Sequence, residues 1–489
     1  MKENLLALGI MTGNSLDGVD TVISRFSSKG KVIDIASDVT PMPEALAEDL
    51  RNLRDIVSIH NGDISKAEAA FCGFRGDRHA LTKLHDDYLG AVIAACKLTI
   101  ENAINKGAIS SVSDIDVVGF HGQTCAHLPP SIARRSGLSP YTVQLGDGQE
   151  LANKLQLPVV YDFRSDDLLN GGEGAPFAPT HHLHLAETTR SYGAFPISFI
   201  NAGNTGNFSV LTKRIGQAST QIMGWNTGPF NHFSNMLARI GKQQRCDIDG
   251  AVGASGRVSK ELLQLLFDRS VATPEGDNFL LQPPPRSLVF QWYRAIPELT
   301  GEAPVLGQVL SLPDRMRTAQ YFAAYLVMYS LTFIPSDSEM PTHFGLAGGG
   351  WKNPVVLNHF KELLSPKSTP VILDNHKDSY LQLRSRLPQK PVTIELTSAY
   401  GFHPQAMEAR IFADAAVHRV WGEPFTFPQT TGVAKPSVCG IVRFPSETPP
   451  RSFKVGAYLE ARGRLSDTIR ETKTNDRRFG RATPSNRTA

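Results

Sequence analysis

A strand, a turn of small polar residues and a second strand occur twice in this chain, and this repeat most constrains its fold. The first copy is LLALGIMTGNSLDGVDTVISRF (residues 5–26), and the second is FPISFINAGNTGNFSVLT (195–212). In both copies, apolar and β-branched runs flank glycine, hydroxyl and amide residues, the composition of two strands joined by a tight turn. The sequence therefore predicts a duplicated hairpin.

Length and the order of the other elements place the chain in the α/β class. With 489 residues the chain is too long for one ordinary core, which predicts two domains. Helical periodicity covers residues 79–106, and a strand signal at 115–120 follows it. The segment HFGLAGGGWKNPVVLNHFKELL (343–364) has the pattern of a strand, a triple-glycine turn and a helix. Such mixing of strands and helices is typical of α/β proteins.

Charge, hydropathy and cysteine usage argue against several classes of protein. A formal net charge of +3 is not that of a nucleic-acid-binding protein. No apolar run is long enough to span a bilayer, and the N-terminal segment has no signal-peptide pattern. Five scattered cysteines without a CxxC pair suggest neither a disulfide framework nor a zinc site. We therefore expect a reducing, cytoplasmic setting.

The glycine-containing turns raise the question of what they hold. Backbone N–H groups and hydroxyls in such turns form concave nests that suit phosphate oxygens. For either strand–turn–strand segment alone, an ordinary hairpin is the favoured interpretation. The run Gly348, Gly349 and Gly350 adds a third place where a ligand can approach the backbone closely. Neither a Walker A loop nor a Rossmann fingerprint is present, which leaves a duplicated hairpin that clamps a nucleotide between two domains.

Nine segments carry a resemblance to a known family, and the resemblance spans roughly residues 8–440. The chain resembles the anhydro-N-acetylmuramic acid kinases, in which these segments occur in the same order: GIMTGNSLDGVD (9–20), GFHGQT (119–124), QLGDGQELA (144–152), VVYDFRSDD (159–167), GGEGAP (171–176), INAGNTGNF (200–208), GWNTGPFN (224–231), GGGWKNP (348–354) and EARIFADAA (408–416). The resemblance implies an α/β, two-domain actin-like fold, which sugar kinases and heat-shock ATPases share.

The resemblance also implies an activity. Members of the family use ATP and Mg²⁺ to open the internal ether of an anhydro sugar while phosphorylating the oxygen released, a step in cell-wall (peptidoglycan) amino sugar recycling. Levoglucosan kinases look like close relatives that act on a smaller anhydro sugar. We therefore expect a cytoplasmic carbohydrate kinase, a phosphotransferase whose partner is a small-molecule sugar and which contacts neither nucleic acid nor a membrane. Family members are often dimers, so a homodimer is an expectation from the resemblance alone.

Expected domain boundaries follow from the same resemblance. An N-terminal actin-like domain with the first phosphate turn covers residues 1–194. A C-terminal actin-like domain with the second phosphate turn and the adenosine motif covers residues 195–445. The remaining residues, 446–489, are polar and rich in arginine and proline, so we expect a basic, disordered tail.

The resemblance assigns roles to individual residues and names no metal ligand. Cofactor-binding positions are Gly13, Asn14, Ser15, Leu16, Asp17, Gly18 and Asp20 at the first phosphate turn, Gly203 and Asn207 at the second, and Gly348, Gly349 and Gly350 near the adenosine. Sugar-side positions are Gln123, Thr124 and Arg164, with Asp147 and Asp167 nearby in the same segments.

Arg164 and the nearby His121 have structural alternatives to a role in sugar binding. The planar, permanently charged guanidinium of Arg164 suits a carboxylate or sugar hydroxyls. A structural salt bridge from Arg164 to Asp162 or Asp167 is an equally open alternative. For His121, a buried, hydrogen-bonded histidine at a strand end is favoured over a sugar ligand. Glu408 is given no role.

Several positions depart from the family pattern. Asn14 stands where the first turn has threonine, and Asn204 stands where the second turn has glycine. Glu173 replaces a glutamine in the glycine-rich loop. Leu288 and Val289 replace a threonine and a glycine.

The main departure is Asn226, which occupies the position of the family's catalytic aspartate. In the family that carboxylate takes a proton from the water that attacks the anomeric carbon. An amide can orient a water but cannot accept its proton at neutral pH, and a general base is typically worth about 10²–10⁴ in rate. Three hypotheses remain: a kinase with another base such as Asp17 or Asp147, a kinase of a sugar that needs no hydrolysis, or a nucleotide- or sugar-binding protein without turnover.

Overall fold

The computed structural model divides into two compact units. It describes residues 3–13, 15–28, 30–190, 193–217, 220–273, 276–284, 286, 288 and 292–468. Within these residues, unit 1 comprises the chain up to Phe177 and from Glu408 onwards, and unit 2 comprises Ala178–Met407. This division corrects the expected domains 1–194 and 195–445, because residues 178–194 belong to unit 2 and the chain returns to unit 1 at Glu408.

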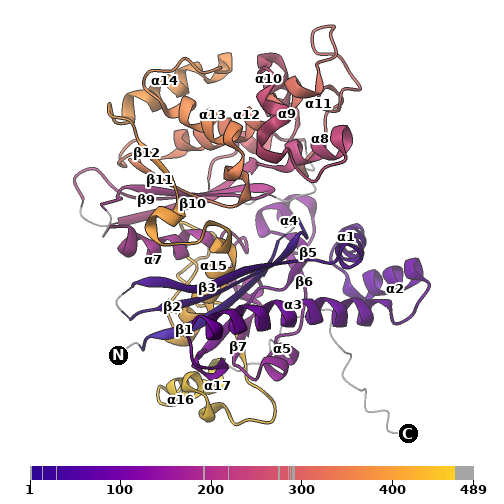
Figure 1. Ribbon diagram of the computed structural model, residues 1–489, viewed down its shortest axis with the longest axis vertical. Coiled ribbons are helices and arrows are strands. Elements are labelled where there is room, and N and C mark those ends of the chain that lie inside the picture. Colours follow the sequence, from indigo (N-terminus) through magenta and orange to yellow (C-terminus); the bar gives the residue numbers. More distant parts are fainter. Residues whose placement is uncertain are drawn as a thin grey trace. The chain divides into compact units, whose positions relative to one another are not determined.

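A six-stranded sheet forms the centre of unit 1 (Figure 1). Its strands, in spatial order, are β13 (Ile441–Arg443), β7 (Val159–Tyr161), β4 (Val117–Phe120), β1 (Leu5–Thr12), β2 (Gly18–Phe26) and β3 (Val32–Pro41). β1, β2 and β3 pair antiparallel as consecutive hairpins. On the other side of β1, β4 pairs with β1 in parallel, and β7 pairs with β4 in parallel. The predicted hairpin at residues 5–26 is thereby confirmed. A separate two-stranded sheet contains β5 (Gln123–Leu128) and β6 (Tyr141–Leu145).

The sheet of unit 2 repeats this topology. Its strands, in spatial order, are β10 (Thr220–Pro229), β9 (Thr205–Lys213), β8 (Ile197–Ala202), β11 (His343–Ala347) and β12 (Thr393–Leu396). β8, β9 and β10 are antiparallel, and β11 and β12 continue the sheet in parallel from β8. Both sheets thus have the order third, second, first, fourth, fifth, with β13 as an addition in unit 1. This repeated order confirms the expected α/β, two-domain actin-like fold.

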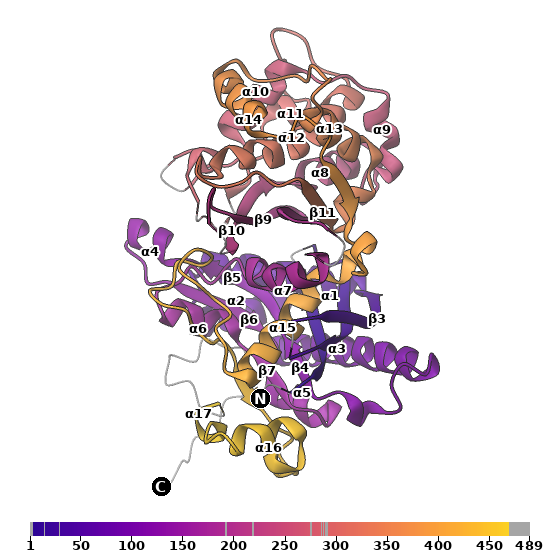
Figure 2. The ribbon, with the colours of Figure 1, turned by 90° about the vertical axis from the view of Figure 1, so that its left-hand side faces the viewer.

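Two helices cover the opposite faces of the unit 1 sheet. Leu8 and Ile10 of β1 belong to the core beneath α3 (Ala80–Asn105), which confirms the helix predicted at residues 79–106. Gly9 points to the other face, because side chains alternate along a strand. There a Cβ on Gly9 would lie 2.0 Å from the carbonyl oxygen of Ala409, in α15 (Met407–Trp421; Figure 2). Only glycine permits this approach, which fixes α15 to unit 1.

The other helices surround the two sheets. Those of unit 1 are α1 (Glu44–Ile59), α2 (Ile64–Arg75), α4 (Pro130–Ser136), α5 (Gly148–Leu155), α6 (Phe163–Leu169), α16 (Lys454–Glu460) and α17 (Leu465–Thr468). Those of unit 2 are α7 (Ala178–Arg190), α8 (His232–Lys242), α9 (Ala251–Ala254), α10 (Lys260–Arg269), α11 (Pro297–Thr300), α12 (Leu312–Ser330), α13 (Pro354–Leu364) and α14 (Lys377–Arg386). Among the described residues, none of these helices has the length and apolarity needed to cross a membrane.

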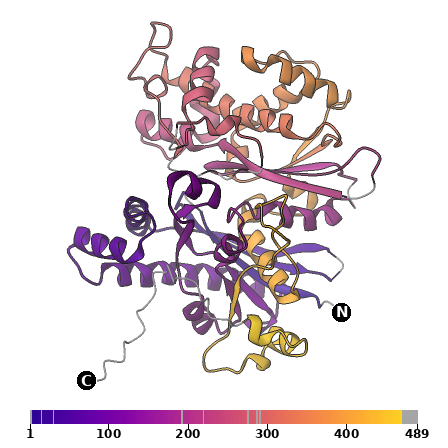
Figure 3. The ribbon, with the colours of Figure 1, turned by 180° about the vertical axis from the view of Figure 1, so that it is seen from behind.

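The first part of the expected disordered tail is ordered, so that expectation is wrong for residues 446–468. α16 and α17 are the yellow helices in Figure 3. Val455 and Leu459, one helical turn apart, are fully buried, and Lys454 lies 3.1 Å from the carboxylate of Asp116. The apolar pair anchors α16 to unit 1 although the surrounding sequence is polar. Residues 469–489 lie outside the described part of the chain.

Candidate functional site

The first turn presents polar side chains at the end of the β1–β2 hairpin. Leu16 adopts a left-handed conformation (φ 57°), and its side chain is buried. Its neighbours Ser15 and Asp17 are exposed, and the hydroxyl of Ser15 donates to Asp17 Oδ1 at 2.7 Å. A buried leucine in a conformation that favours glycine indicates that the surrounding structure holds the turn in place. Gly13 accepts from the Leu16 N–H at 3.2 Å, whereas Asn14 lies outside the described residues.

A group of three acids lies beside this turn in unit 1. Asp20, on β2, has a pKa raised to about 8, first because it is buried and then because Glu408 and Asp17 carry like charges nearby. Glu408 begins the part of α15 that belongs to unit 1, where α15 packs on Gly9. Glu408, which the sequence left without a role, therefore acts on Asp20 electrostatically. A cation bound among these carboxylates would remove the repulsion.

Arg164 lies on α6 and makes hydrogen bonds that differ from the salt bridge considered as its alternative. Its Nε donates to Nε2 of His121 at 2.9 Å, and one terminal nitrogen donates to the carbonyl of Gly174 at 2.6 Å. Within the described part of the chain, Nη2 of Arg164 has no hydrogen-bond partner, and no carboxylate pairs with the guanidinium. Burial lowers the Arg164 pKa to about 10, so the group stays charged at neutral pH. The remaining nitrogen is available to a ligand.

His121 is a neutral, structural residue, as the sequence favoured. It is buried, and its Nδ1 donates to the Gly122 carbonyl at 2.7 Å while its Nε2 accepts from Arg164. Burial, and then the positive charge of Arg164, holds the pKa of His121 well below its usual range. His121 therefore orients Arg164 without competing for its charge.

Gln123 and Thr124 begin β5, close in sequence to His121. The side-chain Nε2 of Gln123 donates to the Thr124 carbonyl at 3.2 Å. Its Oε1 is buried without a hydrogen-bond partner in the described structure. Such an orphaned acceptor is costly unless a ligand donor completes it. The Oε1 atom of Gln123 thus suits a role as acceptor of a hydrogen bond from a hydroxyl or amide of a substrate.

Two aspartates from the sugar-side segments serve the fold. Asp147 is the N-cap of α5, where its carboxylate accepts from the backbone N–H groups of Gln149 at 2.7 Å and Glu150 at 3.1 Å. Asp167 is fully buried and accepts from Gly174 N–H and the hydroxyl of Thr431, both at 2.7 Å. The two backbone hydrogen bonds of Asp147 make it a helix cap, and they argue against its use as the alternative base.

In unit 2 the second turn and the triple glycine lie side by side. A Cβ on Gly348, which has φ 86°, would lie 2.7 Å from backbone atoms of Ala202, the residue before Gly203. A Cβ on Gly350 would lie 2.7 Å from Asn231, whose N–H in turn donates to the Gly203 carbonyl at 3.1 Å. Gly349 has open space where a Cβ would be. Packing therefore requires two of the glycines, and only Gly349 leaves room beside the backbone.

Asn226 is buried on β10, and both ends of its amide are hydrogen-bonded. Its Nδ2 donates to Oδ1 of Asn207 at 2.6 Å, the residue opposite it on β9. Its Oδ1 accepts from the backbone N–H of Leu288 at 2.7 Å. The amide thus joins β9 to the segment around residue 288, a role that uses both its donor and its acceptor. Val289, the other altered position of that segment, lies outside the described residues.

Arg286 and Thr227 are neighbours of Asn226 that the sequence analysis missed. The guanidinium of Arg286 is buried, and it donates to the backbone carbonyls of Asn226 (3.0 Å), Leu280 and Gln282 (both 2.8 Å). Burial lowers the pKa of Arg286 to about 10. The hydroxyl of Thr227 is buried without a partner in the described structure. Thr227 lies in the segment GWNTGPFN (224–231), so the sequence itself places a hydroxyl directly after Asn226.

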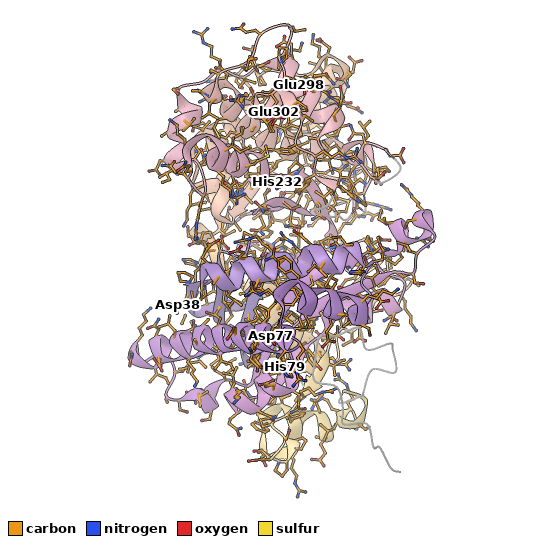
Figure 4. All side chains as sticks on the ribbon, turned by 90° about the vertical axis from the view of Figure 1, so that its right-hand side faces the viewer. Asp38, Asp77, His79, His232, Glu298 and Glu302 are labelled. Carbon is orange, nitrogen blue, oxygen red and sulfur yellow. The ribbon has the colours of Figure 1, made fainter. Side chains whose placement is uncertain are left out.

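Near the same turn, α8 begins with His232, which is labelled in Figure 4. Its ring centroid lies 4.6 Å from that of Tyr293, and the Tyr293 hydroxyl lies 2.6 Å from the Thr205 hydroxyl. Burial, and then Arg239, lowers the pKa of His232 to about 4. The imidazole is therefore neutral at physiological pH, and it adds no positive charge to this end of unit 2.

Comparison with known proteins decides the family. The family model described as anhydro-N-acetylmuramic acid kinase matches residues 5–371. The chain belongs to the anhydro-N-acetylmuramic acid kinase family. It is 32% identical to the family member from Methylorubrum populi, over 90% of this chain and 99% of that protein. It is 30% identical to the member from Methylorubrum extorquens, again over 90% of this chain and 99% of the relative.

Membership in the anhydro-N-acetylmuramic acid kinase family places the chain among carbohydrate kinases, which are phosphotransferases. A solved structure of a ligand-bound xylulose kinase from Lactobacillus acidophilus is 10% identical and covers 95% of this chain and 99% of that one, with a TM-score of 0.32. A sequence identity and a TM-score this low support no inference about function. The roles of single residues in ligand binding stay predictions.

Proposed function

We propose that the chain is an ATP- and Mg²⁺-dependent kinase of an anhydro sugar, with anhydro-N-acetylmuramic acid as the first candidate substrate. The observation that carries this proposal is the acid group of Asp17, Asp20 and Glu408, in which like charges help to raise the pKa of Asp20 to about 8. Carboxylate oxygens are the ligands that Mg²⁺ prefers, and a kinase of this fold brings such a cation with its nucleotide. The residues present therefore fit the cofactor.

Different described residues would have different roles in such a reaction. Asp17, Asp20 and Glu408 would hold Mg²⁺, and bound Mg·ATP would supply the phosphoryl group and neutralise charge during its transfer. Arg164 Nη2 and Gln123 Oε1 are the free donor and the free acceptor that would orient sugar groups. At the second turn Thr227 offers an unpartnered hydroxyl, and Gly349 leaves its backbone open to close approach.

A second candidate function rests on Asn226. An amide is not a base at neutral pH, and the Asn226 amide already donates to Asn207 and accepts from Leu288 N–H. This favours a protein that binds nucleotide and sugar with little turnover, or one that phosphorylates a sugar needing no hydrolysis. With Asp147 committed as a helix cap, Asp17 is the remaining alternative base of the two considered, and it would serve as base only if Asp20 and Glu408 held the Mg²⁺ without it.

One assay separates these candidates. ADP release from Mg·ATP is measured with anhydro-N-acetylmuramate, with levoglucosan, and with the ring-opened N-acetylmuramic acid. Turnover on an anhydro sugar supports the proposed kinase, and turnover only on the ring-opened sugar supports the non-hydrolytic kinase. Binding of sugar and nucleotide by calorimetry without ADP release supports the binding protein. Absence of both binding and turnover would overturn the proposal.

The biological setting is part of the same proposal. Recycling of cell-wall amino sugars is the process that would supply an anhydro-N-acetylmuramate substrate. All five cysteines, Cys72, Cys96, Cys125, Cys246 and Cys439, are free thiols, which fits a reducing cytoplasm. A homodimer remains a proposal from the family resemblance, and light scattering on the purified full chain would test it.

A further inference from the structure

Three groups able to bind a metal ion meet in unit 1, outside the residues assigned above. His85 and Asp86 lie on α3, and Glu150 lies in the first turn of α5. One ligand atom from each side chain lies within 4.8 Å of the other two. α3 and α5 pack against each other, so the group joins two elements that are far apart in sequence.

Two of the three side chains have polar atoms without a partner in the described structure. His85 is 9% exposed, and its Nε2 is buried without a hydrogen-bond partner in the described structure. Its Nδ1 lies 3.6 Å from Asp86 Oδ1, longer than a hydrogen bond. For Glu150, the described residues provide neither an ion pair nor a hydrogen bond to its carboxylate.

Among the described residues, no lysine or arginine forms an ion pair with Asp86 or Glu150. Lys83, two residues before His85 on α3, pairs at 2.6 Å with Asp77, which is labelled in Figure 4. Two carboxylates this close repel each other unless a positive charge lies between them. Asp147 does not belong to the group, because the backbone of α5 occupies its carboxylate.

Imidazole nitrogen combined with carboxylate oxygen is a donor set for Zn²⁺ and related divalent transition metals. Ligand atoms around a tetrahedral zinc lie about 3.4 Å apart when each bond is about 2.0–2.1 Å. The exposed Asp86 and the half-buried Glu150 can close that gap by rotating their side chains, whereas His85 is fixed by burial. We propose that His85, Asp86 and Glu150 form a divalent transition-metal site, with Zn²⁺ as its best occupant, that joins α3 to α5.

The test uses the full chain, freed of metal by dialysis against a chelator and without nucleotide. Titration with ZnCl₂ in a calorimeter should show one ion bound, and zinc should raise the melting temperature of the protein by linkage. His85→Gln and Glu150→Gln should each weaken binding of that ion by about tenfold or more. Asp87→Asn, an exposed acid on the same helix, is the matched control and should bind as the native chain does.

Two further measurements separate this site from other places that attract metal. Asp20→Asn should leave zinc binding unchanged, since Asp20 belongs to the proposed Mg·ATP site. Co²⁺ loaded in place of zinc should show no thiolate charge-transfer band, because the site contains no cysteine. Asp86→Asn, at an exposed position, keeps the test valid if His85→Gln fails to fold. No zinc binding at micromolar metal, binding that survives all three substitutions, or a thiolate band would overturn the proposal.

Discussion

The side-chain amide of Asn226 donates a 2.6 Å hydrogen bond to Oδ1 of Asn207, its direct neighbour across the β9–β10 ladder. The other end of that amide accepts from the N–H of Leu288 at 2.7 Å. An aspartate at this position could keep the second bond but not the first, because a carboxylate cannot donate. Asn207 would then have to turn its own amide to donate instead. If position 226 is that of the family's base, the asparagine there also fixes the local hydrogen-bond pattern.

Asn226→Asp is expected to raise phosphorylation of an anhydro sugar by about 10² or more, because it restores a proton acceptor in the family's catalytic position. The change is nearly isosteric, and Asn207 can supply the donor after its amide turns. ADP release with anhydro-N-acetylmuramate measures the gain. Asn226→Ala is the control, because it removes both hydrogen bonds and adds no base. Equal rates for the native chain and the aspartate variant would mean that another residue is the base.

Gln123→Met should leave the stability of the free protein nearly unchanged and raise KM for the sugar. The substitution removes an orphaned buried acceptor and a 3.2 Å bond, and replaces them with an apolar side chain of similar shape. Loss of one hydrogen bond worth about 1 kcal/mol to the ligand corresponds to roughly a fivefold rise in KM.

Gln144→Met serves as the matched control for this prediction. Gln144 donates to the His121 carbonyl at 2.5 Å, so its loss should lower the melting temperature of the free protein. If Gln123→Met lowers the melting temperature as much and leaves KM unchanged, Gln123 is a structural residue.

Gly349→Ala and Gly350→Ala should behave differently although they are adjacent. A Cβ on Gly350 would lie 2.7 Å from Asn231 and from Phe230, so alanine there should cost about 1–3 kcal/mol of stability. Alanine at Gly349 meets nothing within 4 Å and should leave the free protein as stable as before. If nucleotide approaches this backbone, Gly349→Ala should reduce the rise in melting temperature that Mg·ATP produces. An unchanged rise would place the nucleotide elsewhere.

Local sequence patterns predicted the two hairpins and the long helix, because alternation, turn residues and helical periodicity are short-range signals. The domain division was not predictable in this way. It depends on glycines such as Gly9 and Gly119, whose missing side chains let α15 return to the first sheet from the far end of the chain. Nothing in the neighbourhood of Gly9 in the sequence indicates that contact.

In the candidate site, one role follows from a local sequence pattern and another does not. The resemblance selected Asp147, but that residue begins a helix as Asp-Gly-Gln-Glu, and an aspartate three residues before a glutamate is a known helix-start pattern. The helix cap at Asp147 is therefore predictable from its immediate neighbours. The role of Arg286 depends on its burial against the backbone of residue 226, which only the folded chain shows.

Asp20→Asn should change how the stability of the protein depends on pH. The folded-state pKa of Asp20 is raised to about 8 from an ordinary value of 3.8. Between these values the folded state binds a proton that the unfolded state has released, so stability falls as pH rises through this window. Asparagine does not titrate, so it removes this contribution to the pH dependence of stability. The variant should therefore lose less stability than the native chain between pH 5 and about pH 8.5.

Melting temperatures of the free native chain and of Asp20→Asn, measured across this range, check the prediction. Asp55→Asn is the control, because the Asp55 side chain is 74% exposed and its removal should leave the native pH profile in place. Mg²⁺ with nucleotide should flatten the native profile as well, since a cation among Asp17, Asp20 and Glu408 favours the charged form of Asp20. If Asp20→Asn keeps the full pH dependence of the native chain, then burial, Glu408 and Asp17 do not raise the pKa of Asp20 as described. The strongest argument for Mg²⁺ binding in unit 1 would then fail with it.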